Sequence, residues 1–181
     1  YCGSDRLRVH FECYLVRSQG RTLLVDTGLG NSSSNPNVVA QIGGGIDGVL
    51  LAELRKAGFT AGDIETVFLT HLHPDHVGWN VTRNGADDSP TFPNARYVAH
   101  EADWAAFVTP LDSQIFGYDW WAETVAPLRR LGVLDLITGE TELTGELTVT
   151  PTPGHTPGSM SMIVDSGGEK AFIMGDVFHG P

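Results

Sequence analysis

Short apolar runs separated by Gly, Pro, Asn and Asp recur along the chain, and they predict β-strands. Apolar and polar positions alternate over residues 7–16, and a Ser-Gln-Gly-Arg turn leads from there into a second strand over residues 22–25. Further strands are expected over residues 66–69, 94–99, 146–150, 159–164 and 171–174. A Ser-Gly-Gly-Glu sequence at 166–169 predicts a hairpin turn between the last two.

Apolar positions three and four residues apart predict helices between these strands. A helix from Leu50 to Ala57 is expected, with Asp47 as its cap and Gly58 at its end, and others over residues 101–108 and 122–131. Residues 60–64 predict a short helical turn, whereas the Gly-rich segment 30–48 and the polar segment 82–93 are expected to be loops. Paired strands with single helices favour a layered α+β fold of the αββα kind, with residues 1–181 as a single domain.

The composition narrows the choice of partner. The formal net charge is −11, and the 11 Lys and Arg residues are scattered along the chain, which argues against a nucleic-acid partner. No apolar run approaches the length of a membrane span, so no membrane partner is expected. Cys2 and Cys13 are interpreted as ordinary thiols, although a disulfide between them stays open. A homodimer also stays open.

The densest chemistry lies directly after the strand expected at 66–69. The segment Thr70-His71-Leu72-His73-Pro74-Asp75-His76 places three imidazoles and one carboxylate within a few positions. Imidazole nitrogen and carboxylate oxygen are ligands of zinc and similar divalent metals, and the end of a strand can turn several of them toward one point. We interpret the segment as a metal site. The alternative is a set of solvated histidines on a loop.

Three further polar residues also follow expected strands. Asp26, before Thr27 and Gly28, is either a buried carboxylate that organises a neighbouring loop or a simple turn residue. His155 lies in a Pro-Gly-His-Thr-Pro-Gly turn and Asp176 follows Gly175. Each of the last two is weak evidence alone, but both occupy strand ends as the histidine cluster does.

Aromatic residues gather in the second half of the chain. Trp104, Phe107, Phe116, Tyr118, Trp120 and Trp121 are close together in sequence but not periodic. Core packing is the default interpretation, and walling of an apolar pocket is the alternative.

Together these motifs resemble the metallo-β-lactamase-fold hydrolase superfamily, in that family's order, over nearly the whole chain. The resemblance implies a four-layer αββα sandwich with two divalent metals, with zinc the first choice and Mn, Fe, Co or Ni as alternatives. By this resemblance His71, His73 and His155 hold one metal, Asp75 and His76 hold the other, and Asp176 bridges both. Asp176, where the zinc β-lactamases carry Cys, argues against a true β-lactamase. His at position 73 argues against the diiron oxidoreductase branch.

Within the superfamily the chain looks most similar to methyl-parathion-hydrolase-like and lactonase-like enzymes. The segments that carry this narrower resemblance are 76–80, 92–97 and 175–179. It implies that Asp26, Trp79 and His179 either contact the metal ligands without binding the metal or line the substrate pocket. The family supplies one more histidine beyond the bridging aspartate, and the chain stops before it, so we expect the domain to be truncated at both ends. Localisation stays open, with the cytoplasm as the default.

The expected activity follows from the ligands. A metal-bridging hydroxide would attack a carbonyl carbon or phosphorus, with Asp75 and Asp176 as the catalytic carboxylates. Aromatic rings and the absence of a basic cluster favour a small, neutral, hydrophobic substrate. The first choice is a lactone or carboxylic ester, and the alternative is an organophosphate triester. A non-catalytic metal-binding domain is the alternative of a different class.

Overall fold

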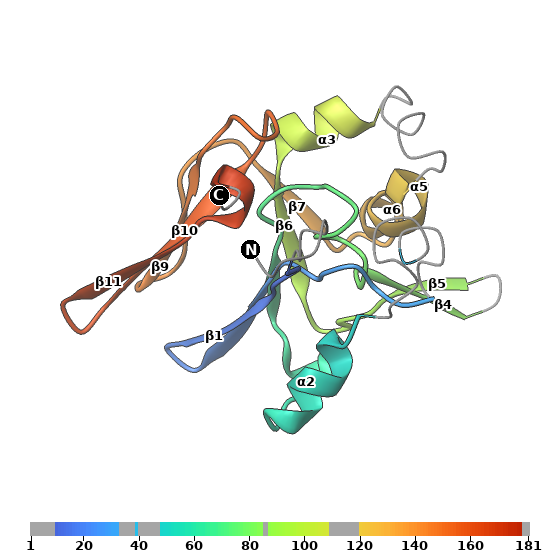
Figure 1. Ribbon diagram of the computed structural model, residues 1–181, viewed down its shortest axis with the longest axis horizontal. Coiled ribbons are helices and arrows are strands. Elements are labelled where there is room, and N and C mark those ends of the chain that lie inside the picture. Colours follow the sequence, from blue (N-terminus) through green and yellow to red (C-terminus); the bar gives the residue numbers. More distant parts are fainter. Residues whose placement is uncertain (1–9, 33–38, 40–47, 85–86, 109–119, 179–181) are drawn as a thin grey trace, which may run out of the picture.

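Two β-sheets form the centre of the molecule. In Figure 1, β9, β10 and β11 of one sheet lie to the left of β6 and β7 of the other. The computed structural model describes residues 10–32, 39, 48–84, 87–108 and 120–178. The first sheet has the order β1 (Tyr14–Ser18), β2 (Arg21–Val25), β3 (Thr66–Phe68), β6 (Arg96–His100) and β7 (Leu134–Ile137). The second has the order β11 (Glu169–Ile173), β10 (Met160–Ser166), β9 (Leu147–Pro151) and β8 (Thr141–Thr144).

The direction of the strands differs between the two sheets. In the first sheet β1 and β2 are antiparallel, whereas β2, β3, β6 and β7 run parallel to one another. The second sheet is antiparallel throughout. The parallel strands bring the carboxyl ends of β2, β3 and β6 to the same edge of the first sheet, where open α/β sheets place their ligands.

The alternation of side chains along the strands divides the core into two clusters. Leu23 and Val25 face one side of the first sheet, where they pack with Met160 and Met162 of the second sheet. Leu24, between them, faces the opposite side and belongs to the cluster that the helices cover. Successive side chains on a strand point to opposite faces, so one run of apolar residues serves both interfaces.

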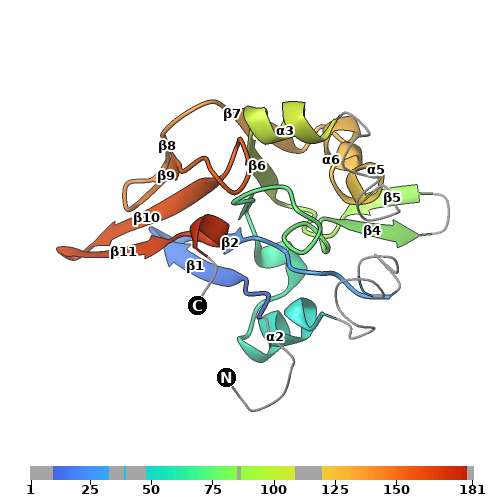
Figure 2. The same ribbon diagram turned by 45° about the horizontal axis from the view of Figure 1, so that its top comes forward.

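Within the described residues, four helices contribute to the cluster that contains Leu24. They are α2 (Leu50–Lys56), α3 (Glu101–Phe107), α5 (Trp120–Thr124) and α6 (Ala126–Arg130). Their buried residues in the helix-covered cluster are Leu54, Phe107, Trp120, Trp121 and Leu128. Figure 2 shows α3, α5 and α6 gathered at one end of the molecule and α2 at the other. A helix layer and two sheets confirm the predicted α+β class, and helices on the outer face of the second sheet stay a prediction.

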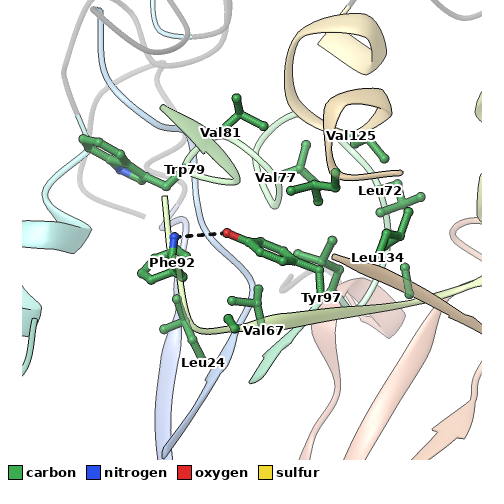
Figure 3. Close-up of a cluster of buried hydrophobic side chains, with 14 of the residues drawn as sticks. Leu24, Val67, Leu72, Val77, Trp79, Val81, Phe92, Tyr97, Val125 and Leu134 are labelled. Atoms are coloured by element: carbon green, nitrogen blue, oxygen red, sulfur yellow. Dashed lines mark hydrogen bonds between the residues drawn. The ribbon is translucent and has the colours of Figure 1, made fainter. Parts of the chain in front are cut away.

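Tyr97 is at the centre of the helix-covered cluster. Its ring is fully buried among Leu24, Val67 and Leu134 (Figure 3). The hydroxyl donates to the carbonyl oxygen of Asn80 at 3.0 Å and accepts from the backbone N–H of Phe92 at 3.2 Å. Burial raises the pKa of this phenol, so it stays protonated as a donor.

Several predicted strand and helix boundaries were wrong. The first strand begins at Tyr14, because its ladder pairs Tyr14 with Val25, the last residue of β2. The polar segment 82–93 contains a hairpin of β4 (Val81–Asn84) and β5 (Asp87–Pro90). Strands β7 and β8 were not predicted, since each has four residues and depends on pairing with a neighbour.

The helix predicted over residues 122–131 is instead two short helices. Pro127 lies at the start of α6, and its missing N–H and fixed φ suit a first helical turn but not a helix interior. At α2 the N-cap is Val49, without a side-chain hydrogen bond, and Asp47 lies outside the described residues. The turn predicted at 60–64 is the 3-10 helix η1 (Ala61–Asp63). Among the described helices, none has the length and apolar character needed to cross a membrane.

Candidate metal centre

The histidine-rich segment begins directly after β3, at the edge where the parallel strands end. His71 is 2% exposed and His76 is 9% exposed, whereas His73 and Asp75 are partly exposed. The segment therefore does not lie in solvent. The alternative of solvated histidines is wrong for the two buried rings.

His155 comes from the loop between β9 and β10 and meets this segment. His73 Nδ1 and His155 Nε2 are 2.9 Å apart. The ring centroids of His71 lie 4.8 Å from those of both His73 and His155. One ligand atom from each of the three rings lies within 4.8 Å of the other two. Ligands about 2.0–2.1 Å from a tetrahedral zinc ion are about 3.3 Å from one another, so small side-chain adjustments fit this group to one ion.

A second group shares His71 with the first. His71, His76 and Asp176 also offer ligand atoms within 4.8 Å of one another. Asp176 lies in the 3-10 helix η2 (Gly175–Val177), with its carboxylate 3.4 Å from His76 Nε2 and 3.6 Å from His155 Nε2. It therefore lies between the two groups, and its role as a bridging ligand stays a prediction. Asp75 Oδ2 is 3.7 Å from His76 Nε2 and borders the second group.

Gly175 allows Asp176 to reach this position. Its φ is +58°, and a Cβ there would lie 2.8 Å from the side chain of Thr70. A larger residue would thus be strained in the backbone and would collide with the loop that holds the histidines.

Asp26 is a buried carboxylate that organises this loop, and the alternative of a simple turn residue is wrong. Its side chain accepts from the Thr70 N–H at 2.7 Å, from Thr70 Oγ1 at 2.7 Å and from His76 Nδ1 at 2.8 Å. Its φ of +58° lies in the left-handed region, which Asp tolerates better than most residues. By holding Nδ1, Asp26 leaves Nε2 of His76 directed to the cluster.

The carboxylates around the cluster favour a positive charge at its centre. Burial disfavours the charged form of His76, but Asp26, Asp176 and Asp75 outweigh it and raise the pKa of His76 to about 11. Burial lowers the pKa of His71 below its usual value, with His76 and His73 adding to the effect. Because its pKa is lowered, His71 is neutral and can donate a lone pair, as a metal ligand must. Burial also raises the pKa of Asp75.

Asp103 is a functional candidate that the sequence analysis missed. It lies on α3, is fully buried, and accepts hydrogen bonds from both ligand-bearing loops. Its partners are Leu72 N at 3.0 Å, Thr156 Oγ1 at 3.0 Å and Gly158 N at 2.6 Å. The neighbouring Trp120 donates its indole N–H to the Leu72 carbonyl at 3.1 Å. A polar residue on the inner face of the predicted helix was the available signal.

The described residues fit a divalent metal. Nε2 of His71 is buried and has no hydrogen-bond partner, and its nearest carboxylate oxygen, on Asp176, is 4.0 Å away. An unpartnered buried nitrogen costs free energy unless something binds its lone pair. Three further imidazoles and the Asp176 carboxylate offer ligand atoms within 4.8 Å of His71 in two groups, and Asp75 borders the second group; imidazole nitrogen and carboxylate oxygen are ligands that zinc takes.

Other predicted site residues are placed elsewhere. Trp79 is 7% exposed and packs in the helix-covered core, so its role beside a substrate stays a prediction. Trp120 is 2% exposed, which makes it a core residue and not a pocket wall. Trp104 is partly buried against Trp121, with ring centroids 4.6 Å apart. His179, Phe116 and Tyr118 lie outside the described residues.

An α+β sandwich with clustered His and Asp side chains at its strand ends defines a class of metal-binding fold. The family model of the metallo-β-lactamase superfamily matches residues 12–181. The chain therefore belongs to the metallo-β-lactamase superfamily, and the resemblance inferred from its motifs is confirmed.

Relatives of known sequence or structure agree with this family. The YobT protein of Bacillus subtilis (strain 168) is 30% identical over 175 residues, which cover 92% of this chain and 61% of YobT. An N-acyl homoserine lactonase of a Bacillus species is 25% identical over 164 residues, covering 85% of this chain and 58% of the lactonase. The structure of AidC, a dizinc quorum-quenching lactonase with a bound product, superposes with a TM-score of 0.69 at 27% identity, covering 91% of this chain and 55% of AidC.

Proposed function

We propose that this chain carries the metal centre of a hydrolase that uses two divalent cations, zinc being the first choice. His71, His73 and His155 hold one cation, Asp75 and His76 the other, and Asp176 lies between them. The chain spans 55–61% of the length of the three relatives described above, so the activity proposed is that of the protein to which the chain belongs.

One observation carries the proposal. His71, buried and with an unpartnered Nε2, is common to both groups of potential ligands. His71 follows β3 of the first sheet, whereas His155 and Asp176 lie in segments that follow β9 and β11 of the second sheet. A fold that only needed packing would gain nothing from burying a bare imidazole nitrogen beside other potential ligand atoms.

The chemistry is a hydrolysis. When bound to these residues, two divalent cations would lower the pKa of a water and polarise the carbonyl oxygen beside the carbon under attack. Asp75, partly exposed and with a pKa raised by burial, takes a proton from the attacking water and returns it to the leaving oxygen. Asp26 keeps His76 oriented through Nδ1 during this cycle. Water adds across the bond, giving an acid and an alcohol.

The proposed substrate is a small neutral lactone or carboxylic ester. Relatives named as N-acyl homoserine lactonases, at 24–31% identity, support this class. The net charge of −11 with scattered basic residues favours a neutral substrate over an anionic one. An organophosphate triester, which presents a similar neutral ester to the same kind of centre, is the alternative.

Initial rates with an N-acyl homoserine lactone and with a paraoxon-type triester test this assignment. The protein is first loaded with zinc, and its metal content is measured by elemental mass spectrometry. Faster turnover of the lactone supports the first choice, whereas faster turnover of the triester supports the alternative. Inactivity of a zinc-loaded protein on both would overturn the substrate class.

Asp75→Asn separates an enzyme from a non-catalytic metal-binding domain. Loss of the proposed proton carrier should lower kcat by about 100- to 10,000-fold while the protein stays folded. Asp135→Asn is the matched control, because Asp135 pairs with Arg96 at the surface. A non-catalytic domain would show no turnover in the unsubstituted protein, and Asp75→Asn would change only its stability.

A further inference from the structure

Two ligand-bearing loops far apart in sequence meet at one carboxylate. The loop after β3 carries His71 and His73, and the loop between β9 and β10 carries His155. Asp103 Oδ2 accepts from the Leu72 N–H of the first loop. The same side chain accepts from the Thr156 hydroxyl and the Gly158 N–H of the second loop.

None of the three bonds is made by a histidine, and two of them come from residues adjacent to one. Leu72 lies between His71 and His73, and Thr156 follows His155 directly. The backbone of Leu72 is held on both sides, since Asp103 accepts its N–H and Trp120 donates to its carbonyl. This arrangement restrains the loop where His71 and His73 leave it.

The second loop is held by internal hydrogen bonds where it meets Asp103. The Thr156 N–H donates to Ser159 Oγ at 3.0 Å, and the two hydroxyl oxygens are 2.7 Å apart. Gly154 N donates to the Thr156 carbonyl at 3.1 Å. Thr156 is 3% exposed and Ser159 5% exposed, so solvent does not compete for these groups. A shift of the Thr156 hydroxyl therefore moves the turn that carries His155.

The approach of α3 to this loop leaves no space for a side chain at position 158. A Cβ on Gly158 would lie 2.5 Å from the backbone nitrogen of Asp103 and 2.8 Å from its Oδ1. Both distances are shorter than real Cβ contacts, and the nearest neighbour is backbone, which cannot swing away. The contact is therefore as close as the backbone permits.

We propose that Asp103 is a positioning residue that joins the two loops and so sets the separation of His73 and His155 for metal binding. The inference rests on the proposed function, because it assigns Asp103 to the first metal group. It gives α3 a role in the centre although none of its side chains is a proposed ligand. Three neutral donors around one buried carboxylate would otherwise be a costly way to hold two loops together.

Zinc affinity of the purified protein, measured by competition with a chromophoric chelator, tests this role together with thermal unfolding in EDTA. Asp103→Asn keeps the volume but turns an NH₂ group toward N–H or O–H donors. Gly158→Ala pushes the loops apart from the other side. Both should raise the Kd of one zinc equivalent by about 10- to 100-fold, the range for partners of metal ligands.

Two matched variants control for the chemistry of the change. Asp135→Asn makes the same replacement in a half-exposed ion pair, and Gly139→Ala adds a methyl group where no heavy atom lies within 4 Å. Neither should change the zinc Kd by more than about twofold, because surface groups contribute little. Thr156→Val, which removes one donor to Asp103, should fall between the controls and Asp103→Asn.

A purely structural role would give a different result. If Asp103→Asn and Gly158→Ala lower the unfolding temperature in EDTA but leave both zinc constants unchanged, the positioning role is wrong. If Asp103→Asn does not fold, Gly158→Ala and Thr156→Val decide by the same criterion. Absence of zinc binding by the unsubstituted protein would instead overturn the proposed function and the inference built on it.

Discussion

Two buried carboxylates, Asp26 and Asp103, hold the candidate metal centre in different ways. Each accepts three hydrogen bonds from the loops that carry the histidines. Asp26 contacts a proposed ligand directly, since one of its partners is His76 Nδ1. Asp103 contacts backbone N–H groups and one hydroxyl.

The two carboxylates therefore have different roles: Asp26 orients a ring, and Asp103 sets the distance between two loops. Asp26 places negative charge beside an imidazole, so it acts on the charge and direction of His76. Asp103 has neutral donors around it, and burial raises its pKa although those hydrogen bonds oppose the rise. Its contribution is therefore geometric, through the distance between two loops.

His71→Ala should have the largest effect, because this ring is common to both groups of ligands. Binding of the zinc equivalent that His71 holds with His73 and His155 should weaken by more than about 100-fold, beyond the range for partners of ligands. Elemental mass spectrometry after dialysis measures the remaining metal. His10→Ala, at an exposed position, is the control. Retention of two equivalents by His71→Ala would contradict the proposed role of His71 as a ligand.

The next largest effects are expected for Asp26→Asn and Asp103→Asn, which should weaken the zinc affinity of different ligand groups. In a His76→Ala background only the three-histidine group remains, and Asp103→Asn should weaken its zinc affinity by about 10- to 100-fold, more than Asp26→Asn does. In a His73→Ala background the group of His71, His76 and Asp176 remains, and the order should reverse. Chelator competition measures both constants. Equal effects in both backgrounds would remove the distinction between the two carboxylates.

The free energy of unfolding of the metal-free protein should depend on pH through the contact between Asp26 and His76. The pKa of His76 is raised from its ordinary 6.5 to about 11, so its stabilising contribution is full below pH 6.5 and is lost as the pH rises toward 11. The free energy of unfolding in EDTA should therefore fall across this window. Asp26→Asn should flatten the fall, and Asp103→Asn should leave it in place. Urea unfolding from pH 6 to pH 10 measures it.

Trp120→Phe should have the smallest effect. The change keeps most of the buried ring but leaves the Leu72 carbonyl without its 3.1 Å donor, which costs about 1–3 kcal/mol of stability. Zinc affinity should change less than with either carboxylate variant, since the Leu72 N–H still binds Asp103. Thermal unfolding and chelator competition measure the two quantities. A larger affinity loss than with Asp103→Asn would make the indole the main restraint on this loop.

Much of the candidate site could be predicted because its residues are adjacent in sequence and chemically distinctive. His71, His73, Asp75 and His76 follow one apolar strand, and that pattern alone predicted a metal site. His155 and Asp176 were weak evidence by themselves, and the resemblance to the family joined them to the cluster. The structure brings both within the same few ångströms.

Asp103 and the roles of the aromatic residues could not be predicted in the same way. Asp103 shares its helix with the exposed Glu101, and although its place on the inner face was a signal, its partners lie in loops far away in the chain. Trp120 was one of many aromatic residues with core packing and a pocket wall both open. Strands β7 and β8 were missed because four residues carry too little pattern without their neighbours.

The sequence by itself determined which residues could bind a metal and that most of them follow strands, because ligand chemistry and strand periodicity are local properties. The tertiary structure alone decided which carboxylates are buried, which loops touch and how far apart the rings lie. Those properties depend on contacts between residues far apart in the chain, as with Asp103 and Gly158, which no local pattern encodes.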